Sequence, residues 1–369
     1  APPLAAEWFA DAFPFRHSLI RAHNAALWFL VGVSPDRGMV RGEDEWLFLS
    51  GGPTLRVHRG ELLDGDELAD WVDPHRDWRD WLAARDVELA FCIAPEKQTV
   101  YGDRAPRWMG PYAARTRTDQ FLEGLAEVGI TAIDTRSALR ALAREELVYY
   151  PLGTHWNDRG AYVAYEQILE ALDDPRFGPV EPLAAFRQYD RSEEVENWQG
   201  DSWMGRMHMH ALVGQADNNL ELRDISYRLL SFWPAAAGGF DGLVVGGRPD
   251  LPRVVLLRDS FGNWLWPLLA SHCSQLITES FNRFDPDLVD LILPDYVVHI
   301  RVERLLGTAP PRLKLRDGEL GRARAWNAAS EASFDGERID GEGRQRLLVR
   351  GTRPRPPIDS ESVRADWPS

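Results

Sequence analysis

The stretch "RVVLLRDSFGN" (253–263) carries an apolar run into a charged and polar junction at Arg258, Asp259 and Ser260. The run predicts a buried strand, and the pattern that follows it predicts a helix directly behind. A serine at such a junction has two interpretations. It can be a helix N-cap, because its hydroxyl accepts a hydrogen bond from an otherwise unpaired backbone N–H. It can also be a nucleophile, since the exposed N–H groups and the helix dipole there stabilise developing negative charge.

Strands and helices alternate along much of the chain. Apolar runs at 87–95, 129–134, 253–258 and 296–302 predict buried strands, with helical patterns between them. This alternation predicts an α/β fold with a doubly wound, mainly parallel sheet, helices on both faces and irregular insertions. The other expected elements are helices over 4–32, 64–85, 112–128, 137–146, 159–172 and 261–272, a hairpin over 39–52, and short strands at "LVYYP" (147–151) and "SQLIT" (274–278).

The regular pattern is interrupted twice. Residues 173–250 are rich in turns and short strand candidates, so we expect an irregular insertion there within a domain that spans 1–306. Residues 307–369 are rich in Gly, Pro and Arg and predict a C-terminal appendage or tail.

The composition limits the class of protein. The formal net charge of −15 argues against a nucleic-acid partner and against docking on an anionic membrane surface. It also disfavours a strongly anionic polymer as ligand unless an arginine cluster offsets it locally. No apolar run reaches the length of a membrane span, since "AALWFLVGV" (25–33) is too short. Cys92 and Cys273 permit one disulfide, but their apolar surroundings suit two buried free thiols as well.

A second polar stretch belongs with the serine. "YYPLGTHWNDRGAY" (149–162) places His155 between a predicted strand and a predicted helix. In a doubly wound sheet, ligands bind beyond the carboxyl ends of the strands, where Ser260 also lies. Two candidate catalytic side chains at one sheet edge favour the nucleophile over the plain cap for Ser260.

Six segments of the chain resemble one known family in that family's order. They are "GEDEWLFL" (42–49), "APEKQTVYGDRAP" (94–106), "THWNDRGA" (154–161), "GDSWM" (200–204), "RDSFGN" (258–263) and "PDYVVHIRVERLL" (294–306). Together they resemble the alginate O-acetyltransferase family of the AlgJ/AlgX type, whose fold is a variant of the SGNH hydrolases. The resemblance covers about residues 5–306 and implies an SGNH-hydrolase-like acetyltransferase domain.

The resemblance assigns a nucleophile and a base. Ser260 matches the family's catalytic serine and His155 its histidine base, which fits the need of a serine hydroxyl for an adjacent proton acceptor. The family usually carries an aspartate two residues before the histidine, and here that position is Gly153. Three alternatives follow: Asp158 or Asp134 substitutes in space, a backbone carbonyl or water holds His155, or the chain is a weakened or non-catalytic relative.

Further residues are candidates for binding the substrate or the oxyanion. Phe261, through its backbone N–H, and Asn263 are expected near the oxyanion, and Lys97, Tyr101 and Arg283 near acyl or sugar oxygens. Each has a structural alternative, as a solvated, loop-packing or surface residue. Asp201 is interpreted as a turn-former in "GDSW". His208 and His210 lack a Cys or carboxylate at ligand spacing, so no metal site is expected.

The function implied by the resemblance is an exported polysaccharide O-acetyltransferase that works through an acyl-serine and needs no cofactor. The alternatives are a carbohydrate acetylesterase with the same residues and a non-catalytic polysaccharide-binding or assembly factor. The implied partners are a polysaccharide acceptor and a membrane acyltransferase that delivers the acetyl group. We expect a periplasmic or cell-envelope location; residues 1–20 hold no signal peptide, so any leader or membrane anchor would be absent from this chain.

Overall fold

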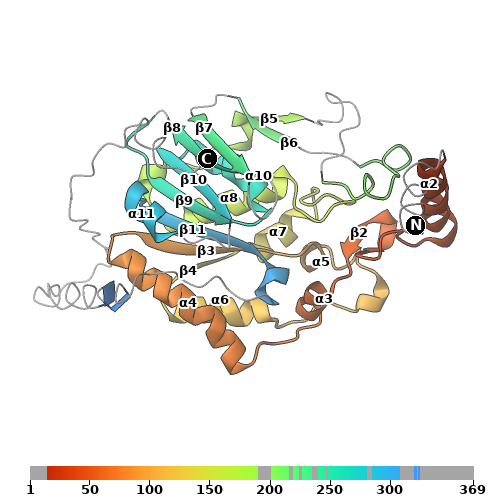
Figure 1. The fold of residues 1–369 in the computed structure, drawn as a ribbon, viewed down its shortest axis with the longest axis horizontal. Coiled ribbons are helices and arrows are strands. Elements are labelled where there is room, and N and C mark those ends of the chain that lie inside the picture. Colours follow the sequence, from red (N-terminus) through yellow and green to blue (C-terminus); the bar gives the residue numbers. More distant parts are fainter. Residues whose placement is uncertain are drawn as a thin grey trace, which may run out of the picture.

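The centre of the molecule is a seven-stranded sheet in the order β4-β3-β11-β9-β10-β8-β7 (Figure 1). In this computed structural model, five neighbouring strands run parallel and the last two pair antiparallel. The strands are β3 (Glu88–Ala94), β4 (Thr131–Asp134), β7 (Tyr227–Pro234), β8 (Phe240–Gly246), β9 (Arg253–Arg258), β10 (Gln275–Ser280) and β11 (Tyr296–Val302). The four predicted strands all lie in the parallel part, which confirms the predicted fold class.

The structure describes residues 15–189, 201–215, 219–223, 227–234, 240–246, 248–280, 285–307, 320–321 and 323–324. The expected tail over 307–369 lies almost wholly outside these residues, as does Arg283. The helix predicted over 4–32 is described from residue 15, as α2 (Arg16–Ala26) and a π-helical turn (Leu27–Val31). No helix in the described part has the length and apolarity needed to cross a membrane.

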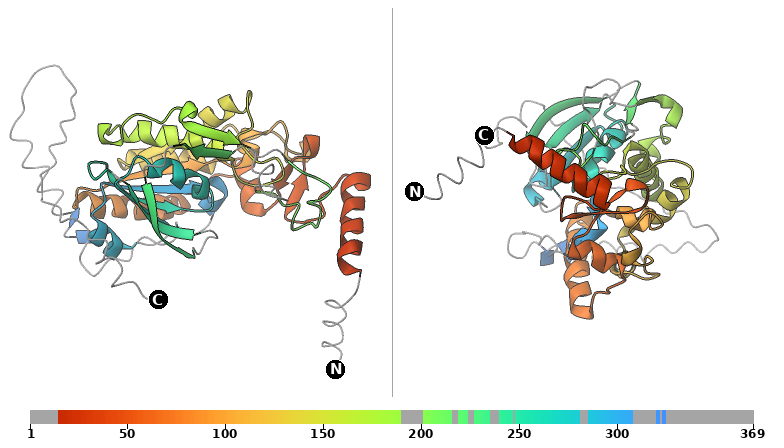
Figure 2. Two further views of the ribbon diagram at one scale, coloured as in Figure 1. Left: turned by 90° about the horizontal axis from the view of Figure 1, so that it is seen from above. Right: turned by 90° about the vertical axis from the view of Figure 1, so that its right-hand side faces the viewer.

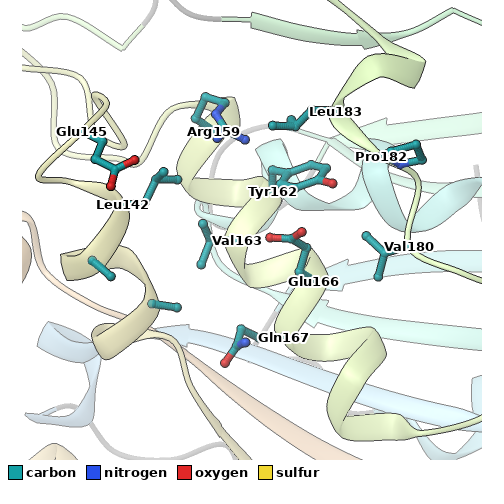
Figure 3. Close-up of a pocket in the computed structure, with 12 residues that line it drawn as sticks. Leu142, Glu145, Arg159, Tyr162, Val163, Glu166, Gln167, Val180, Pro182 and Leu183 are labelled. Carbon is teal, nitrogen blue, oxygen red and sulfur yellow. The ribbon is translucent and has the colours of Figure 1, made fainter.

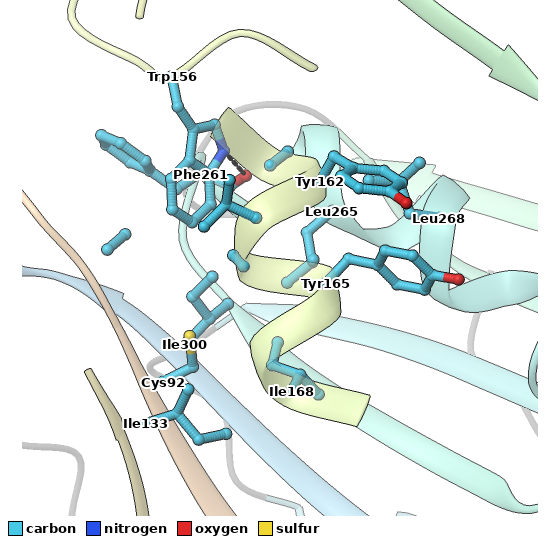
Figure 4. Close-up of a cluster of buried hydrophobic side chains, with 14 of the residues drawn as sticks. Cys92, Ile133, Trp156, Tyr162, Tyr165, Ile168, Phe261, Leu265, Leu268 and Ile300 are labelled. Carbon is cyan, nitrogen blue, oxygen red and sulfur yellow. Dashed lines mark hydrogen bonds between the residues drawn. The ribbon is translucent and has the colours of Figure 1, made fainter. Parts of the chain in front are cut away.

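One face of the sheet is covered by α8 (Asp158–Leu172) and α10 (Gly262–Ala270). Because side chains alternate along a strand, Cys92 and Ile300 point to this face, where they belong to the same buried cluster as Tyr165 of α8 and Leu265 of α10 (Figure 4). Cys92 and Cys273 are both buried and free, so they form no disulfide with each other.

The opposite face packs against α4 (Gly65–Ala83), α6 (Arg117–Glu127) and α11 (Pro286–Ile292). Phe91, one residue before Cys92, points to this side and contacts Phe121 of α6 edge to face, with ring centroids 5.0 Å apart. Helices on both faces agree with the prediction. The remaining elements are β1 (Met39–Arg41), β2 (Leu47–Leu49), α3 (Gly52–His58), α5 (Lys97–Val100), α7 (Arg136–Leu142), β5 (Phe186–Tyr189) and β6 (Asn219–Leu222).

Two expectations differ from the structure. "LVYYP" is not a strand of the sheet, because this segment pairs with its own continuation: Asn157 N–H donates to Val148 O at 3.1 Å and Tyr150 N–H to His155 O at 3.2 Å. The segment 173–250 is more regular than expected, since β7 and β8 extend the main sheet and β5 pairs with β6.

Gly160 in the first turn of α8 offers a test of this packing. A Cβ at this position would lie 2.3 Å from Val148 O and 2.7 Å from Trp156 Cβ. Gly→Ala in a helix ordinarily stabilises by about 1 kcal/mol, but Gly160→Ala should destabilise the fold by about 1–3 kcal/mol through overpacking. Urea unfolding followed by tryptophan fluorescence measures the change.

Gly65→Ala at the start of α4 is the matched control, because nothing lies within 4 Å of its Cβ position. It should leave stability unchanged or slightly raised. A Gly160→Ala variant as stable as the wild type would contradict the close approach of α8 to Val148.

Candidate active site

The junction after β9 is held by Asp259 rather than by Ser260. The Asp259 carboxylate is buried and accepts the backbone N–H groups of Phe261 at 2.9 Å and Val302 at 2.7 Å, which ties the turn to β11. Burial raises the pKa of Asp259, while these two hydrogen bonds oppose the shift. Ser260 therefore does not cap the helix, and its hydroxyl is directed at another group.

That group is His155. The Ser260 hydroxyl lies 2.7 Å from His155 Nε2, although 105 residues separate the two in the chain. The imidazole packs between Phe261 and Trp264, with ring centroids 4.7 and 4.8 Å away. Trp156 ties the His155 loop to the segment after Ser260, because its indole N–H donates to Phe261 O at 3.0 Å. These ring contacts and the hydrogen bond to Ser260 together orient the imidazole towards the serine.

The far nitrogen of His155 meets Asp201. Asp201 Oδ2 lies 2.8 Å from Nδ1 and also accepts the backbone N–H groups of Thr154 at 2.6 Å and His155 at 2.8 Å. A carboxylate only accepts, so Nδ1 carries the proton and Nε2 is free to accept from Ser260. Burial alone would raise the pKa of Asp201, but the hydrogen bonds and the charge of His155 outweigh it and hold the pKa well below its usual range.

Gly153 makes room for Asp201. A Cβ at residue 153 would lie 2.0 Å from Asp201 O and 2.4 Å from Asp201 Oδ2. The carboxylate thus occupies the space into which an aspartate at 153 would project. The interpretation of Asp201 as a mere turn-former was wrong. Its segment "GDSWM" was noted, but nothing local in it shows a contact to a histidine 46 residues away.

The two aspartates suggested as substitutes have other partners. Asp134 accepts from Arg136, through the backbone N–H and the guanidinium at 2.7–3.0 Å. Asp158 accepts the backbone N–H of Leu220 at 2.7 Å and so holds β6 against the start of α8. Neither carboxylate is the acceptor of the His155 ring, because their own loops commit them to these contacts.

Lys97 binds the loop that carries His155 rather than pointing into solvent. Its side chain is buried, and its ammonium donates to the carbonyl oxygens of Tyr150, Pro151 and Gly153 at 3.0, 2.8 and 2.6 Å. Burial lowers the pKa of Lys97 to about 7, while the charge of Asp201 opposes the shift. The three bonds fix the backbone around Gly153, and sequence reasoning had placed this lysine at the substrate instead.

Gln215 joins the loops that carry the acid and the base. Its side-chain carbonyl accepts the N–H of Leu152 at 2.7 Å, and its amide donates to Asp201 O at 3.0 Å. Trp203 N–H adds a second link, to Leu152 O at 3.0 Å. Sequence reasoning missed Gln215 as well as Trp264, since neither lies in a recognisable motif.

The other residues predicted to bind the substrate or the oxyanion have different surroundings. Tyr101 is buried, accepts Val148 N–H at 3.0 Å and packs on Trp46, so it supports the loop from behind. The Phe261 N–H is engaged by Asp259, whereas the Ser260 N–H makes no hydrogen bond among the described residues. Asn263 lies half-buried in the first turn of α10. Arg283 lies outside the described residues.

The described part of the chain also has a groove on its surface. This groove has a volume of about 760 Å³ and runs along α8, between α7 and residues 180–183 (Figure 3). Ser260, His155 and Asp201 do not line it. Within the described ranges, no group of three or more His, Cys, Asp or Glu side chains is placed to hold a metal ion. The side chains that meet at this edge of the sheet are Ser260, His155 and Asp201, which we call the relay.

Comparison with known proteins identifies the family. A family model described as the SGNH hydrolase-like domain of the acetyltransferase AlgX matches residues 39–227, which is just over half of the 369-residue chain. The chain belongs to that family. The match confirms the resemblance found in the sequence, and it includes His155 and Asp201, while Ser260 lies beyond it.

Individual relatives share less of the chain or less of its sequence. The chain is 31% identical over 171 residues to a probable alginate O-acetylase AlgJ of Pseudomonas syringae pv. tomato; the match covers 44% of this chain and 40% of that protein. Among solved structures, a DHHW family protein from Eubacterium siraeum has a TM-score of 0.55 at 14% identity, over 79% of this chain and 97% of the other. The O-acetyltransferase domain of Pseudomonas putida AlgJ has a TM-score of 0.51 at 18% identity, over 78% and 99%. At these identities the structural likeness concerns the fold alone.

Gly153→Ala tests whether the position of Asp201 depends on the absence of a side chain at residue 153. The new methyl group would collide with the Asp201 backbone, so the acid should move away from His155. We expect the downfield proton resonance of His155 Nδ1–H to disappear, as it should in Asp201→Asn. Gly205→Ala, in the same loop but with nothing within 4 Å of its Cβ position, should retain it. Persistence of the resonance in Gly153→Ala would refute the spatial argument.

Asp201 also predicts a dependence of stability on pH. The unfolded chain takes up a proton on this carboxyl near pH 4, whereas the folded chain resists it because the pKa is lowered. Asp201→Asn should therefore cost about 2 kcal/mol of unfolding free energy at neutral pH. The difference from the wild type should shrink as the pH falls below about 4.

Urea unfolding of both proteins across this pH range measures the difference. Asp103→Asn is the control, since the Asp103 side chain is 78% exposed and should give no such change. A wild-type advantage that stays constant down to low pH would contradict the lowered pKa.

Proposed function

We propose that this chain is a polysaccharide O-acetyltransferase that works through an acetyl-Ser260 intermediate. The observation that supports this most is the continuous relay from Ser260 Oγ to His155 Nε2 at 2.7 Å and from His155 Nδ1 to Asp201 Oδ2 at 2.8 Å. Such a relay activates a serine by placing a base on its proton and an acceptor behind the base. Membership in an acetyltransferase family supports the same reaction class.

In the first half-reaction, Ser260 Oγ attacks the carbonyl carbon of the acetyl donor while His155 Nε2 takes the hydroxyl proton. The negative charge that develops on the carbonyl oxygen is stabilised by the Ser260 N–H, with the Asn263 side chain as a second candidate donor. When the tetrahedral intermediate collapses, the bond to the donor group breaks and His155 returns the proton to it. Asp201 stabilises the imidazolium in between without taking its proton.

In the second half-reaction, a sugar hydroxyl attacks the acetyl-serine carbonyl and passes its proton to His155. Collapse breaks the ester bond to Ser260, whose oxygen recovers the proton. The same steps with water in place of the sugar describe an acetylesterase. We favour transfer because the family model is that of an acetyltransferase.

The non-catalytic alternative depended on the loss of the acid at position 153. Asp201 supplies a carboxylate at the same place, so the reason for expecting a decayed site is removed.

The proposed surroundings of the enzyme are the periplasm or cell envelope, with a membrane acyltransferase as source of the acetyl group. One relative bears the name of an alginate O-acetylase, which suggests a polysaccharide as acceptor.

Acetate release from p-nitrophenyl acetate tests the nucleophile and the relay. Ser260→Ala and His155→Ala should each reduce turnover to near the uncatalysed rate. A small residual turnover can remain, because the oxyanion donors still stabilise the transition state. Asp201→Asn should reduce kcat by about 10²–10⁴-fold, because the wrong tautomer of His155 is then favoured. Mass spectrometry of the wild-type enzyme, quenched during turnover of p-nitrophenyl acetate, should place an acetyl group on Ser260.

Ser271→Ala at the far end of α10 and His210→Ala are matched controls that should keep full turnover. With an oligosaccharide present, acetylated sugar in place of free acetate distinguishes transfer from hydrolysis. Equal turnover of the wild type and Ser260→Ala would contradict the proposed mechanism and favour a binding factor.

A further inference from the structure

The first described segment of the chain exposes an unusual amount of apolar surface. Ten large apolar side chains are exposed among the described residues, and six of them lie between residues 15 and 33. Leu30 is 84% exposed and Phe15 67%. The six are Phe15, Leu19, Phe29, Leu30, Val31 and Val33. We call these six the N-terminal apolar face. Scattered apolar residues are normal on a surface, but a contiguous group marks an interaction site.

The helical spacing shows that this face is continuous. Phe15 and Leu19 are followed by Ala22 and Ala26 at intervals of three and four residues, which places all four on one side of α2. Phe29, three residues on, extends the stripe into the π-helical turn. An amphipathic helix ordinarily turns such a stripe towards the protein core. Here the stripe faces away from it.

The other side of the helix is the one that holds it to the molecule. Asn24 donates to Met207 O at 2.7 Å, and Trp28 is fully buried among side chains that include Met207 and Met209. The ring of His17 lies 5.2 Å from that of His208. α2 lies at one end of the molecule, away from the main sheet, so its apolar stripe meets no other described element (Figure 2).

The charge of this segment also differs from that of the chain. Between Asp11 and Asp36 the sequence holds Arg16 and Arg21 but no Asp or Glu, in a chain with a formal net charge of −15. An apolar stripe flanked by cations suits an anionic lipid surface, where the stripe enters the interface and the arginines meet the headgroups. A second copy of this chain would cover the stripe but bring the same cations together.

We propose that the N-terminal apolar face docks the protein on a bilayer that contains anionic phospholipid, with α2 lying in the plane of the interface. The inference does not depend on the proposed catalytic function. It has a geometric consequence, because the opposite side of the helix contacts Met207 and His208 in the loop that begins with Asp201. A docked protein would hold this loop close to the membrane surface.

Co-sedimentation with vesicles tests the proposal. The full chain should bind vesicles of phosphatidylcholine mixed with phosphatidylglycerol, and roughly tenfold more weakly vesicles of phosphatidylcholine alone. The double variant Phe29→Glu/Leu30→Glu should bind the mixed vesicles at least tenfold more weakly, since each carboxylate would have to enter the apolar interface. Arg21→Glu should weaken binding to the mixed vesicles only.

The matched control is Leu62→Glu/Leu291→Glu, two exposed leucines elsewhere on the surface. It should bind vesicles as the wild type does, and all these variants should keep wild-type turnover of p-nitrophenyl acetate. Lack of wild-type binding to both kinds of vesicle would overturn the proposal, as would an equal loss of binding in the control. A wild-type dimer in light scattering that Phe29→Glu/Leu30→Glu separates, without vesicle binding, would show self-association instead.

Discussion

The contact between Asp201 and His155 is the interaction on which the rest of the site depends. A partly buried carboxylate is stable only when its lone pairs are occupied, and Asp201 Oδ2 receives one ring N–H and two backbone N–H groups. These bonds place the acid behind the base, and the base in turn reaches Ser260. The arrangement is possible only because residue 153 has no side chain. One missing Cβ thus decides from which segment the acid can come.

Because Asp201 lies in a loop far from His155 in the chain, contacts between the two segments must hold it in place. An acid two residues before the histidine would be positioned by the same short loop, whereas Asp201 must be held against His155 by contacts between segments. Lys97 saturates three carbonyl oxygens of the loop around Gly153, and Gln215 joins Leu152 to Asp201. Burying the lysine is costly, which is why its pKa falls to about 7. The polar groups behind the site therefore serve its geometry more than its stability.

The sequence alone predicted what depends on local pattern. The strands at 253–258 and 296–302 begin and end where predicted, because segments rich in β-branched and other apolar residues lie between turn residues there, although His299 and Arg301 interrupt the second. Ser260 follows β9 at the carboxyl edge of the sheet, as predicted. His155 reaches that edge from a loop and not from a strand of the sheet, so its pairing with Ser260 could be predicted only from the family resemblance. Asp201 could not, because an aspartate in a Gly-Asp-Ser turn satisfies every local rule without a distant partner. β7 and β8 were missed because they lie in a turn-rich segment and their sequences, "YRLLSFWP" and "FDGLVVG", hold only short apolar runs.

The loop from Asp201 to Gln215 links two parts of the molecule that the sequence keeps far apart. Its first residue completes the relay, its last residue fixes that first one, and Met204, Met207 and Met209 between them pack with Trp28 beneath α2. Methionine side chains adapt to irregular gaps, so this packing tolerates small shifts of the helix better than branched side chains would. Asp201 is thus linked to the N-terminal helix through its own loop and the methionine side chains that pack with Trp28. Leu152, one residue before Gly153, belongs to the same cluster as Trp28, so the segment that carries His155 reaches the N-terminal helix as well.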